Sequence, residues 1–210
     1  MLDAIEKEYG FVYPQLYKQL YHEGMLNWGT LGSGWYQTVY PTLKSAPPFL
    51  IYGDDFEIME LPDIQEWLSK GPPYGDKGHR FVPFGYTGAG DWYAFYLNLQ
   101  EGDNIPVVQV WHDANRACVL AKNLQDFIFS QMLHAITDQE DNDSLITDGD
   151  LKENCQNFLR THGPYLTPHQ RSIVADAYEK GSLKGKELFN ILSEEINFEW
   201  LDKCFPYQAE

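Results

Sequence analysis

The sequence lacks long hydrophobic runs and is poor in basic residues. No stretch of about 18 consecutive apolar residues occurs, so a membrane-spanning helix is not predicted. The opening letters, MLDAIEKEYG, carry charges throughout and no apolar segment, so no signal peptide is expected. The 15 lysines and arginines are outnumbered by 31 aspartates and glutamates, which gives a formal net charge of -16. Because nucleic acids and anionic membranes would repel such a chain, neither is expected as a partner, and a basic protein is favoured.

Cysteine is also scarce. The chain contains Cys118, Cys155 and Cys204, an odd number with no Cys-x-x-Cys pair among them. This pattern supports neither a disulfide framework nor a zinc site. We therefore expect free thiols in a reducing compartment and a cytoplasmic location.

Motifs of catalysis and of cofactor binding are missing. The sequence has no Gly-x-Ser-x-Gly, no His-Glu-x-x-His and no phosphate-binding loop with Lys-Ser or Lys-Thr. The glycines before Asp91, in Gly-Ala-Gly-Asp, are not followed by the helix and the later acidic residue that a dinucleotide site requires. We expect them to form a turn in which Asp91 bonds backbone amides, and we predict no catalytic residue, no cofactor and no metal.

What the sequence does contain is an ordered series of helical and strand patterns. Apolar residues at helical spacing predict two short helices before residue 24 and another helix at 62–70. A strand around 35–40 and a hairpin of strands at 49–52 and 56–61 are expected. Four more aromatic or β-branched runs, at 79–86, 91–98, 106–112 and 116–121, predict an antiparallel meander. A helix is expected after it, at 124–136. This order of elements indicates an α+β fold.

The composition changes after residue 137. The letters DQEDNDSLITDGD hold six acidic residues and no basic one, which is typical of a solvated connection. Helical patterns follow at 151–162, 167–180 and 186–196. The sequence therefore predicts three segments: an α+β domain at 1–137, an acidic connection at 138–150 and a helical C-terminal extension at 151–210.

The strand expected at 91–98 is apolar on both faces. Alternation places Trp92 and Tyr96 on one face and Tyr93 and Phe95 on the other. Such a strand is either central and covered on both sides, or it presents an aromatic face to a partner. If Trp92 and Tyr96 are exposed, they are candidate anchors for a partner protein, and if they are buried, they belong to the core.

The letters WHD at 111–113 suggest acid-base chemistry. A histidine that is hydrogen-bonded to a carboxylate can act as a general base, so His112 with Asp91 or Asp113 could form the site of a small hydrolase. A histidine at the end of a strand is more often a turn or core residue. That structural interpretation is favoured here.

Two groups of residues follow an order that is known from one protein superfamily. The opening IEKEYGFVYPQLYKQLYHEG combines a helix that ends near Gly, a Pro-led helix and a second Gly. Later come a strand, a Gly-Asp pair, an aromatic strand, a further strand and a helix, marked by Phe81, Phe84, Gly88, Gly90, Asp91, Trp92, Tyr93, Val107 to Asp113, Leu124, Phe127 and Ile128. This order resembles the SUKH superfamily, the Smi/Knr type of domain, over roughly residues 2–136. The connection at 27–48 and the C-terminal extension depart from it.

The resemblance implies a curved sheet flanked by helices and a role in protein binding without catalysis. Bacterial members are typically immunity proteins that bind and neutralise toxins, whereas fungal members regulate cell-wall synthesis by binding other proteins. We therefore predict a non-enzymatic immunity protein with a basic toxin as its partner. An intracellular regulator of the cell-wall type is the alternative, and the hydrolase is the third hypothesis; the oligomeric state is left open. The candidate partner-binding residues are Asp54, Asp55, Asp91, Trp92, Tyr96 and Asp113.

Overall fold

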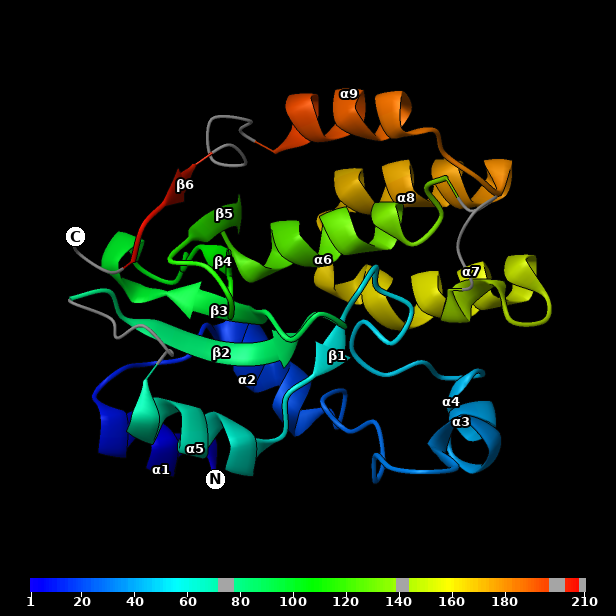
Figure 1. Cartoon of the computed structure of the whole chain (residues 1–210). Helices are drawn as coiled ribbons and strands as arrows, with labels where there is room; N and C mark the ends of the chain where they lie inside the picture. The colour runs from blue at the N-terminus through cyan, green and yellow to red at the C-terminus, as the bar shows by residue number, and fades with distance from the viewer. Residues whose placement is uncertain (72–77, 139–143, 197–202, 208–210) are drawn as a thin grey trace. The chain divides into compact units, whose positions relative to one another are not determined.

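A computed structural model describes residues 1–71, 78–138, 144–196 and 203–207 (Figure 1). Its contacts divide the chain into two compact units. Unit 1 contains Met1–Gln19, Glu57–Phe127 and Asn197–Glu210, and unit 2 contains Leu20–Phe56 and Ile128–Ile196. Each unit therefore combines segments that lie far apart in the sequence.

The chain begins with two short helices, as predicted. The first, α1 (Leu2–Tyr9), is ended by Gly10, whose φ of 69° is a left-handed conformation that glycine adopts without strain. The second is α2 (Gln15–His22). Glu6 of α1 and Lys18 of α2 form an ion pair of 2.7 Å, which links the two helices across their connection.

Unit 1 is built on a curved antiparallel sheet, which confirms the predicted α+β class and the meander (Figure 1). In the described part of the chain the sheet has six strands, and their spatial order is their order in the sequence. Every neighbouring pair is antiparallel. The strands are β1 (Glu57–Ile58), β2 (Phe81–Tyr86), β3 (Trp92–Tyr96), β4 (Val107–Val110), β5 (Ala117–Ala121) and β6 (Cys204–Phe205).

Strand β3 is central and both of its faces are covered, one of the two arrangements expected from the sequence. On one face, Tyr96 packs into a buried cluster with side chains of β2, β4 and β5. On the other face, the ring centroid of Phe95 lies 5.3 Å from that of Tyr17, and the centroid of Tyr93 lies 5.3 Å from that of Phe127. The aromatic residues of β3 therefore supply core on both sides of the sheet.

Helix α5 (Leu61–Lys70) packs beside α1 and the first strands of the sheet. The carbonyl oxygen of Gln65 accepts a hydrogen bond of 3.3 Å from the hydroxyl of Tyr9. The indole of Trp67 makes an edge-on contact with that of Trp92, with ring centroids 5.9 Å apart. The helix expected at 62–70 is thus confirmed, and its tryptophan is packed against the sheet.

The hairpin expected at 49–52 and 56–61 is wrong. Residues 49–52 form tight turns, with Leu50 at a φ of 51° and its carbonyl oxygen bonded to the amide of Gly53. Their side chains are buried, so the apolar run reflects burial rather than pairing. Of the second expected strand, only β1 joins the sheet, and its partner is β2.

The segment expected as a strand at 35–40 is helical. It forms α3 (Trp35–Thr38) and the start of α4 (Tyr40–Leu43). The rings of Tyr36 and Tyr40 stack with their centroids 5.3 Å apart. Aromatic residues four positions apart meet on one side of a helix, and this contact favours the helical conformation over the strand.

Unit 2 contains most of the described helices that follow the meander. Asp150 caps the first helix after the acidic connection by accepting a hydrogen bond of 3.1 Å from the amide of Glu153. Thr167 and Gln170 form a reciprocal capping box at the next helix. The helical patterns predicted from the sequence are confirmed as α6 (Leu124–His134), whose second part lies in unit 2, α7 (Leu151–His162), α8 (Pro168–Lys180) and α9 (Gly185–Glu195).

Strand β6 and a disulfide correct two further expectations. β6 pairs with β5 so that Cys118 and Cys204 are direct partners in the ladder, and the two form a disulfide across 86 residues. The expectation of free thiols at all three cysteines is therefore wrong for Cys118 and Cys204. Cys155 is a free cysteine and is buried. The two cysteines of the disulfide are too far apart in the sequence to form a recognisable spacing motif. Their pairing becomes evident only from the register of β5 and β6.

Several expectations lie partly outside the described residues. These are the acidic connection at 139–143 and the extension at 197–202 and 208–210. The division into an α+β domain, an acidic connection and a helical extension stays a prediction. Within the described ranges, no helix combines the length and the apolar character that crossing a membrane requires.

Candidate functional site

Two hairpin turns lie at the same end of the sheet in unit 1, because β2 to β5 run alternately in opposite directions. The turn between β2 and β3 is closed by a hydrogen bond of 2.8 Å from the amide of Thr87 to the carbonyl oxygen of Asp91. Gly90 adopts a φ of 92° within it, so the predicted turn role of the glycine is confirmed at this position. The turn between β4 and β5 carries His112 and Asp113.

The carboxylate of Asp91 joins the two turns. One oxygen, Oδ1, accepts a hydrogen bond of 3.0 Å from the backbone amide of His112 and another of 2.8 Å from its ring Nδ1. The other oxygen, Oδ2, accepts a bond of 2.8 Å from Nε2 of Gln109. Asp91 is only 7% exposed, so these three donors replace the water that the carboxylate would otherwise bind.

The surroundings of Asp91 keep it ionised at neutral pH. Burial raises the pKa of the carboxyl group, but the hydrogen bonds from the His112 amide, the His112 ring and Gln109 favour the charged form. The net effect holds the pKa below its ordinary value. Asp91 therefore works as a buried acceptor that fixes one turn against the other.

His112 is oriented by this carboxylate. Because a carboxylate has no hydrogen to donate, Nδ1 of His112 carries the proton in this hydrogen bond. The side chain is 41% exposed, so a general base could in principle be presented to solvent here. Within the described residues, however, no serine, threonine or cysteine side chain is hydrogen-bonded to the ring.

Asp113 completes a small group of possible metal ligands. One potential ligand atom each from Asp91, His112 and Asp113 lies within 4.8 Å of the others. Oδ1 of Asp91 already accepts two N–H donors and Oδ2 accepts one, so three of the roughly four acceptor positions of the carboxylate are used within the protein. The donor set therefore fits a structural carboxylate better than a metal ligand.

Partly exposed aromatic residues and carboxylates lie next to the two turns. Tyr86 and Trp92 are opposite each other on β2 and β3, and both are partly exposed. Burial, and then the negative charges of Asp63, Glu66 and Glu57, raise the pKa of Tyr86 to about 12. We call these five residues the acidic aromatic face; it combines two aromatic side chains with three carboxylates, of which Glu66 is ion-paired with Lys70.

The structure brings together three of the six predicted partner-binding residues. Asp91, Trp92 and Asp113 share one end of the sheet, and Asp113 is the exposed one of the two acids. Tyr96 is at the other end of β3, is 6% exposed, and its hydroxyl lies 2.6 Å from Nδ1 of His79. Tyr96 is therefore a core residue.

The remaining two candidates, Asp54 and Asp55, belong to unit 2. Both are exposed, and Asp55 adopts a positive φ of 47°. A partner-binding role for any of the six stays a prediction.

Sequence reasoning missed Gln109 and the carboxylates around Tyr86. Gln109 is the polar residue in the apolar strand VVQV, and a polar side chain inside such a run signals a buried partner. Glu57, Asp63 and Glu66 gave no comparable signal, because an acidic chain has many exposed carboxylates. Their proximity to Tyr86 depends on the packing of α5 beside the sheet.

No curated protein matches the chain, and no solved structure matches it. The sequence model of the SMI1/KNR4 family (SUKH-1) matches residues 1–130, which include α1, α2 and the strands β1 to β5. Because this match covers more than half of the chain and includes both turns of the candidate site, the protein belongs to the SMI1/KNR4 family (SUKH-1).

Proposed function

We propose that this protein is a binding module that neutralises a basic toxin by direct association. Membership of the SMI1/KNR4 family supports a role in protein-protein interaction. The net charge of -16 supports a positively charged partner, because opposite net charges accelerate encounter. The role as an immunity protein follows the bacterial members of the superfamily that the sequence resembles.

The acidic aromatic face is the surface that carries this proposal. A toxin with lysine or arginine side chains would meet Glu57, Asp63 and Glu66 at the rim, where charges mainly set the association rate. Tyr86 and Trp92 would then supply the apolar contact, and aromatic side chains are frequent energetic centres of interfaces. Asp91 contributes indirectly, since it fixes the two turns next to which the face lies.

The first experiment is capture of a partner from a lysate of the source cells by immobilised protein, at low and at high salt. The proposal expects a basic protein whose toxic activity stops on binding and whose association rate falls as salt increases. A captured protein without toxic activity would contradict the immunity role.

Charge variants then test the face itself. The face variant carries three substitutions, Glu57→Gln, Asp63→Asn and Glu66→Gln. The matched control removes the same charge from exposed positions of α8 and α9, by Asp176→Asn, Glu179→Gln and Glu194→Gln. Association should slow roughly ten-fold or more in the face variant and far less in the control. Equal slowing would show that net charge alone matters and would remove the face from the proposal.

A regulatory or scaffold role is the second candidate, because one exposed apolar side chain on α9 favours it. Phe189 is 53% exposed, and an apolar residue on an amphipathic helix is a common docking element. Phe189→Asp should abolish capture of a regulatory partner and leave capture of a toxin unchanged. If Phe189→Asp captures the same partners as the wild type, the regulatory role is excluded.

A small hydrolase is the third candidate, because the bond of 2.8 Å between Asp91 and the His112 ring meets its geometric condition. Hydrolysis of p-nitrophenyl acetate, measured on the wild type and on His112→Ala, tests it. A rate that is identical in the two proteins would exclude His112 as a general base.

A further inference from the structure

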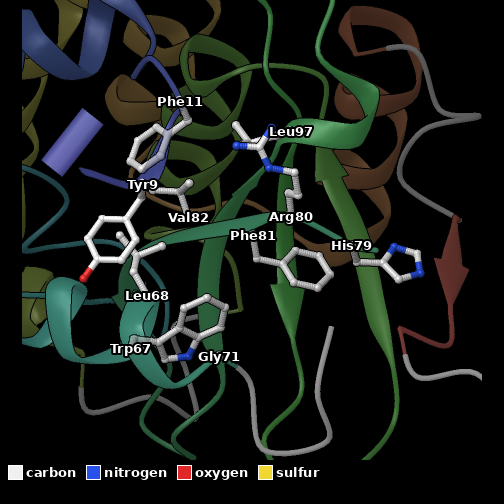
Figure 2. Close-up of a pocket in the computed structure, with 10 residues that line it drawn as sticks. All are labelled: Tyr9, Phe11, Trp67, Leu68, Gly71, His79, Arg80, Phe81, Val82 and Leu97. Atoms are coloured by element: carbon white, nitrogen blue, oxygen red, sulfur yellow. The ribbon is translucent and has the colours of Figure 1, made fainter. Parts of the chain in front are cut away.

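A pocket in unit 1 lies away from the acidic aromatic face and has a different chemistry. The end of α1, the end of α5, the start of β2 and Leu97 after β3 line an open pocket with a volume of about 140 Å³. Figure 2 shows the rings of Tyr9, Phe11, Trp67 and Phe81 arranged around it, with Arg80 at the rim. The lining residues come from four separate parts of the sequence, so no motif indicates the pocket.

The size and lining of the pocket limit its occupant. Sites for cofactors and drug-sized ligands typically measure about 300 to 1,000 Å³, so this one suits a single side chain. Its walls combine the aromatic rings with the aliphatic side chains of Leu68, Val82 and Leu97, and His79 and Arg80 add polar groups. An apolar side chain would therefore be the part of a ligand that enters.

Arg80 gives the rim a positive charge in a strongly acidic protein. One guanidinium nitrogen, Nη2, donates a hydrogen bond of 2.8 Å to the carbonyl oxygen of Gly10, which holds the side chain in place. Within the described residues, no acidic side chain lines the pocket and Arg80 forms no ion pair with a carboxylate. The other N–H groups of the guanidinium fork match the geometry of a carboxylate.

We propose that this pocket binds the C-terminal residue of a protein partner, with its apolar side chain between the aromatic rings and its α-carboxylate on Arg80. An α-carboxylate is attached to the same residue as the side chain, so one residue can satisfy both features of the pocket. The inference rests on the proposed function as a protein-binding module and adds the chemistry of a second contact.

Short peptides test the pocket without the natural partner. The probes are acetyl-Gly-Gly-Phe with a free carboxylate, the same peptide as its carboxamide, and acetyl-Gly-Gly-Gly with a free carboxylate. Binding is followed by NMR shifts of backbone amides next to the pocket. We expect the first probe to bind roughly ten-fold more tightly than each of the others, since a charge-assisted bond and the side chain both contribute.

Two substitutions of Arg80 and one control substitution test whether the carboxylate preference depends on Arg80. Arg80→Gln should remove the preference for carboxylate over carboxamide, whereas Arg171→Gln, which removes the same charge from an exposed site on α8, should keep it. Arg80→Lys retains the charge without the fork and should show an intermediate preference. A normal thermal transition in each variant establishes that it is folded.

The outcomes separate this proposal from the proposed function. No shift near the pocket with any peptide, or equal affinity for the carboxylate and the carboxamide, overturns the pocket proposal even if a toxin is captured. Equal binding of 3-phenylpropionate and acetyl-Gly-Gly-Phe would also overturn it, in favour of a site for small free acids. A carboxylate preference that depends on Arg80 supports it whatever the lysate experiment finds.

Discussion

At the scale of single residues, Asp91 holds two turns together through three hydrogen bonds. The variant Asp91→Ala leaves the donors on Gln109 and His112 without an acceptor, so we expect it to lower the free energy of unfolding by about 2 kcal/mol. Urea denaturation measures the change, with Asp113→Ala, an exposed carboxylate on the neighbouring turn between β4 and β5, as the control. Equal stability of the two variants would refute the structural role of Asp91.

The same residue should make stability depend on pH in the acid range. The pKa of Asp91 is lowered in the folded protein, so its contribution is present above the ordinary value of 3.8 and is lost as pH falls through the lower folded value. The difference in unfolding free energy between the wild type and Asp91→Ala should therefore shrink on acidification. A difference that stays constant with pH would contradict the charged state proposed for Asp91.

His162 in unit 2 predicts a second pH effect of the same sign. Burial lowers the pKa of its ring to about 3, and its Nε2 accepts a hydrogen bond of 3.0 Å from the amide of Leu50. Between the ordinary value of 6.5 and about 3, the unfolded chain binds a proton that the folded protein excludes. Stability should thus fall on acidification below pH 6.5, by at most about 1.4 kcal/mol per pH unit from this residue.

The variant His162→Gln isolates this effect, because glutamine keeps an acceptor but does not titrate. We expect a lower stability at neutral pH and a shallower loss between pH 7 and 5, measured by chemical denaturation. His22→Gln, at the exposed end of α2, is the matched control and should retain the slope of the wild type. An unchanged slope in His162→Gln would mean that the buried ring is not the source.

At the scale of elements, β6 is fastened to β5 by both a ladder and a covalent bond. Because the disulfide closes a loop of 86 residues, its reduction should lower the free energy of unfolding by about 3 to 5 kcal/mol in the chain-entropy picture. The measurement compares denaturation with and without reductant, and Cys204→Ser should not respond to reductant. Thiol counting on denatured, unreduced protein is the independent check: one reactive thiol fits the structure, and three would contradict it.

The helices and strands differ in how well they could be predicted from the sequence. The helices α1, α2 and α5 to α9, the strands β2 to β5 and the turn at Gly90 follow from local spacing and were predicted, whereas α3 and α4 were expected as a strand. Residues 49–52 were misassigned because a buried irregular turn and a buried strand have the same apolar composition. About half of the candidate site could be predicted from the sequence, because turn residues mark the positions of Asp91 and His112. The Cys118–Cys204 pair and the acids beside Tyr86 could not be predicted, because they depend on contacts between distant segments.

At the scale of the whole molecule, the last described residues return to the sheet of unit 1. Tyr207 is fully buried in the cluster beside β3, and its hydroxyl donates a hydrogen bond of 3.0 Å to the carbonyl oxygen of Trp111. A fragment of residues 1–137 lacks this side chain, whose burial alone contributes about 2 kcal/mol. We expect the fragment to bind the dye ANS and to unfold at a lower temperature than the full chain.

The control for the fragment is the full chain with Cys118→Ser and Cys204→Ser, which keeps the residues of β6 but not the covalent bond. It should bind less dye than the fragment. If the fragment unfolds cooperatively at the temperature of the full chain, then residues 1–137 are an independent domain, as the sequence suggests.

The bond between Cys118 and Cys204 also has a mechanical consequence. If the chain were stretched from its two ends, the load would pass through the sulfur atoms and bypass the 86-residue interval between them. That interval would hide roughly 300 Å of contour length. With the bond intact, α6 to α9 would bear no tension even after both ends had been pulled straight, and a reductant would release the hidden length as a single long extension.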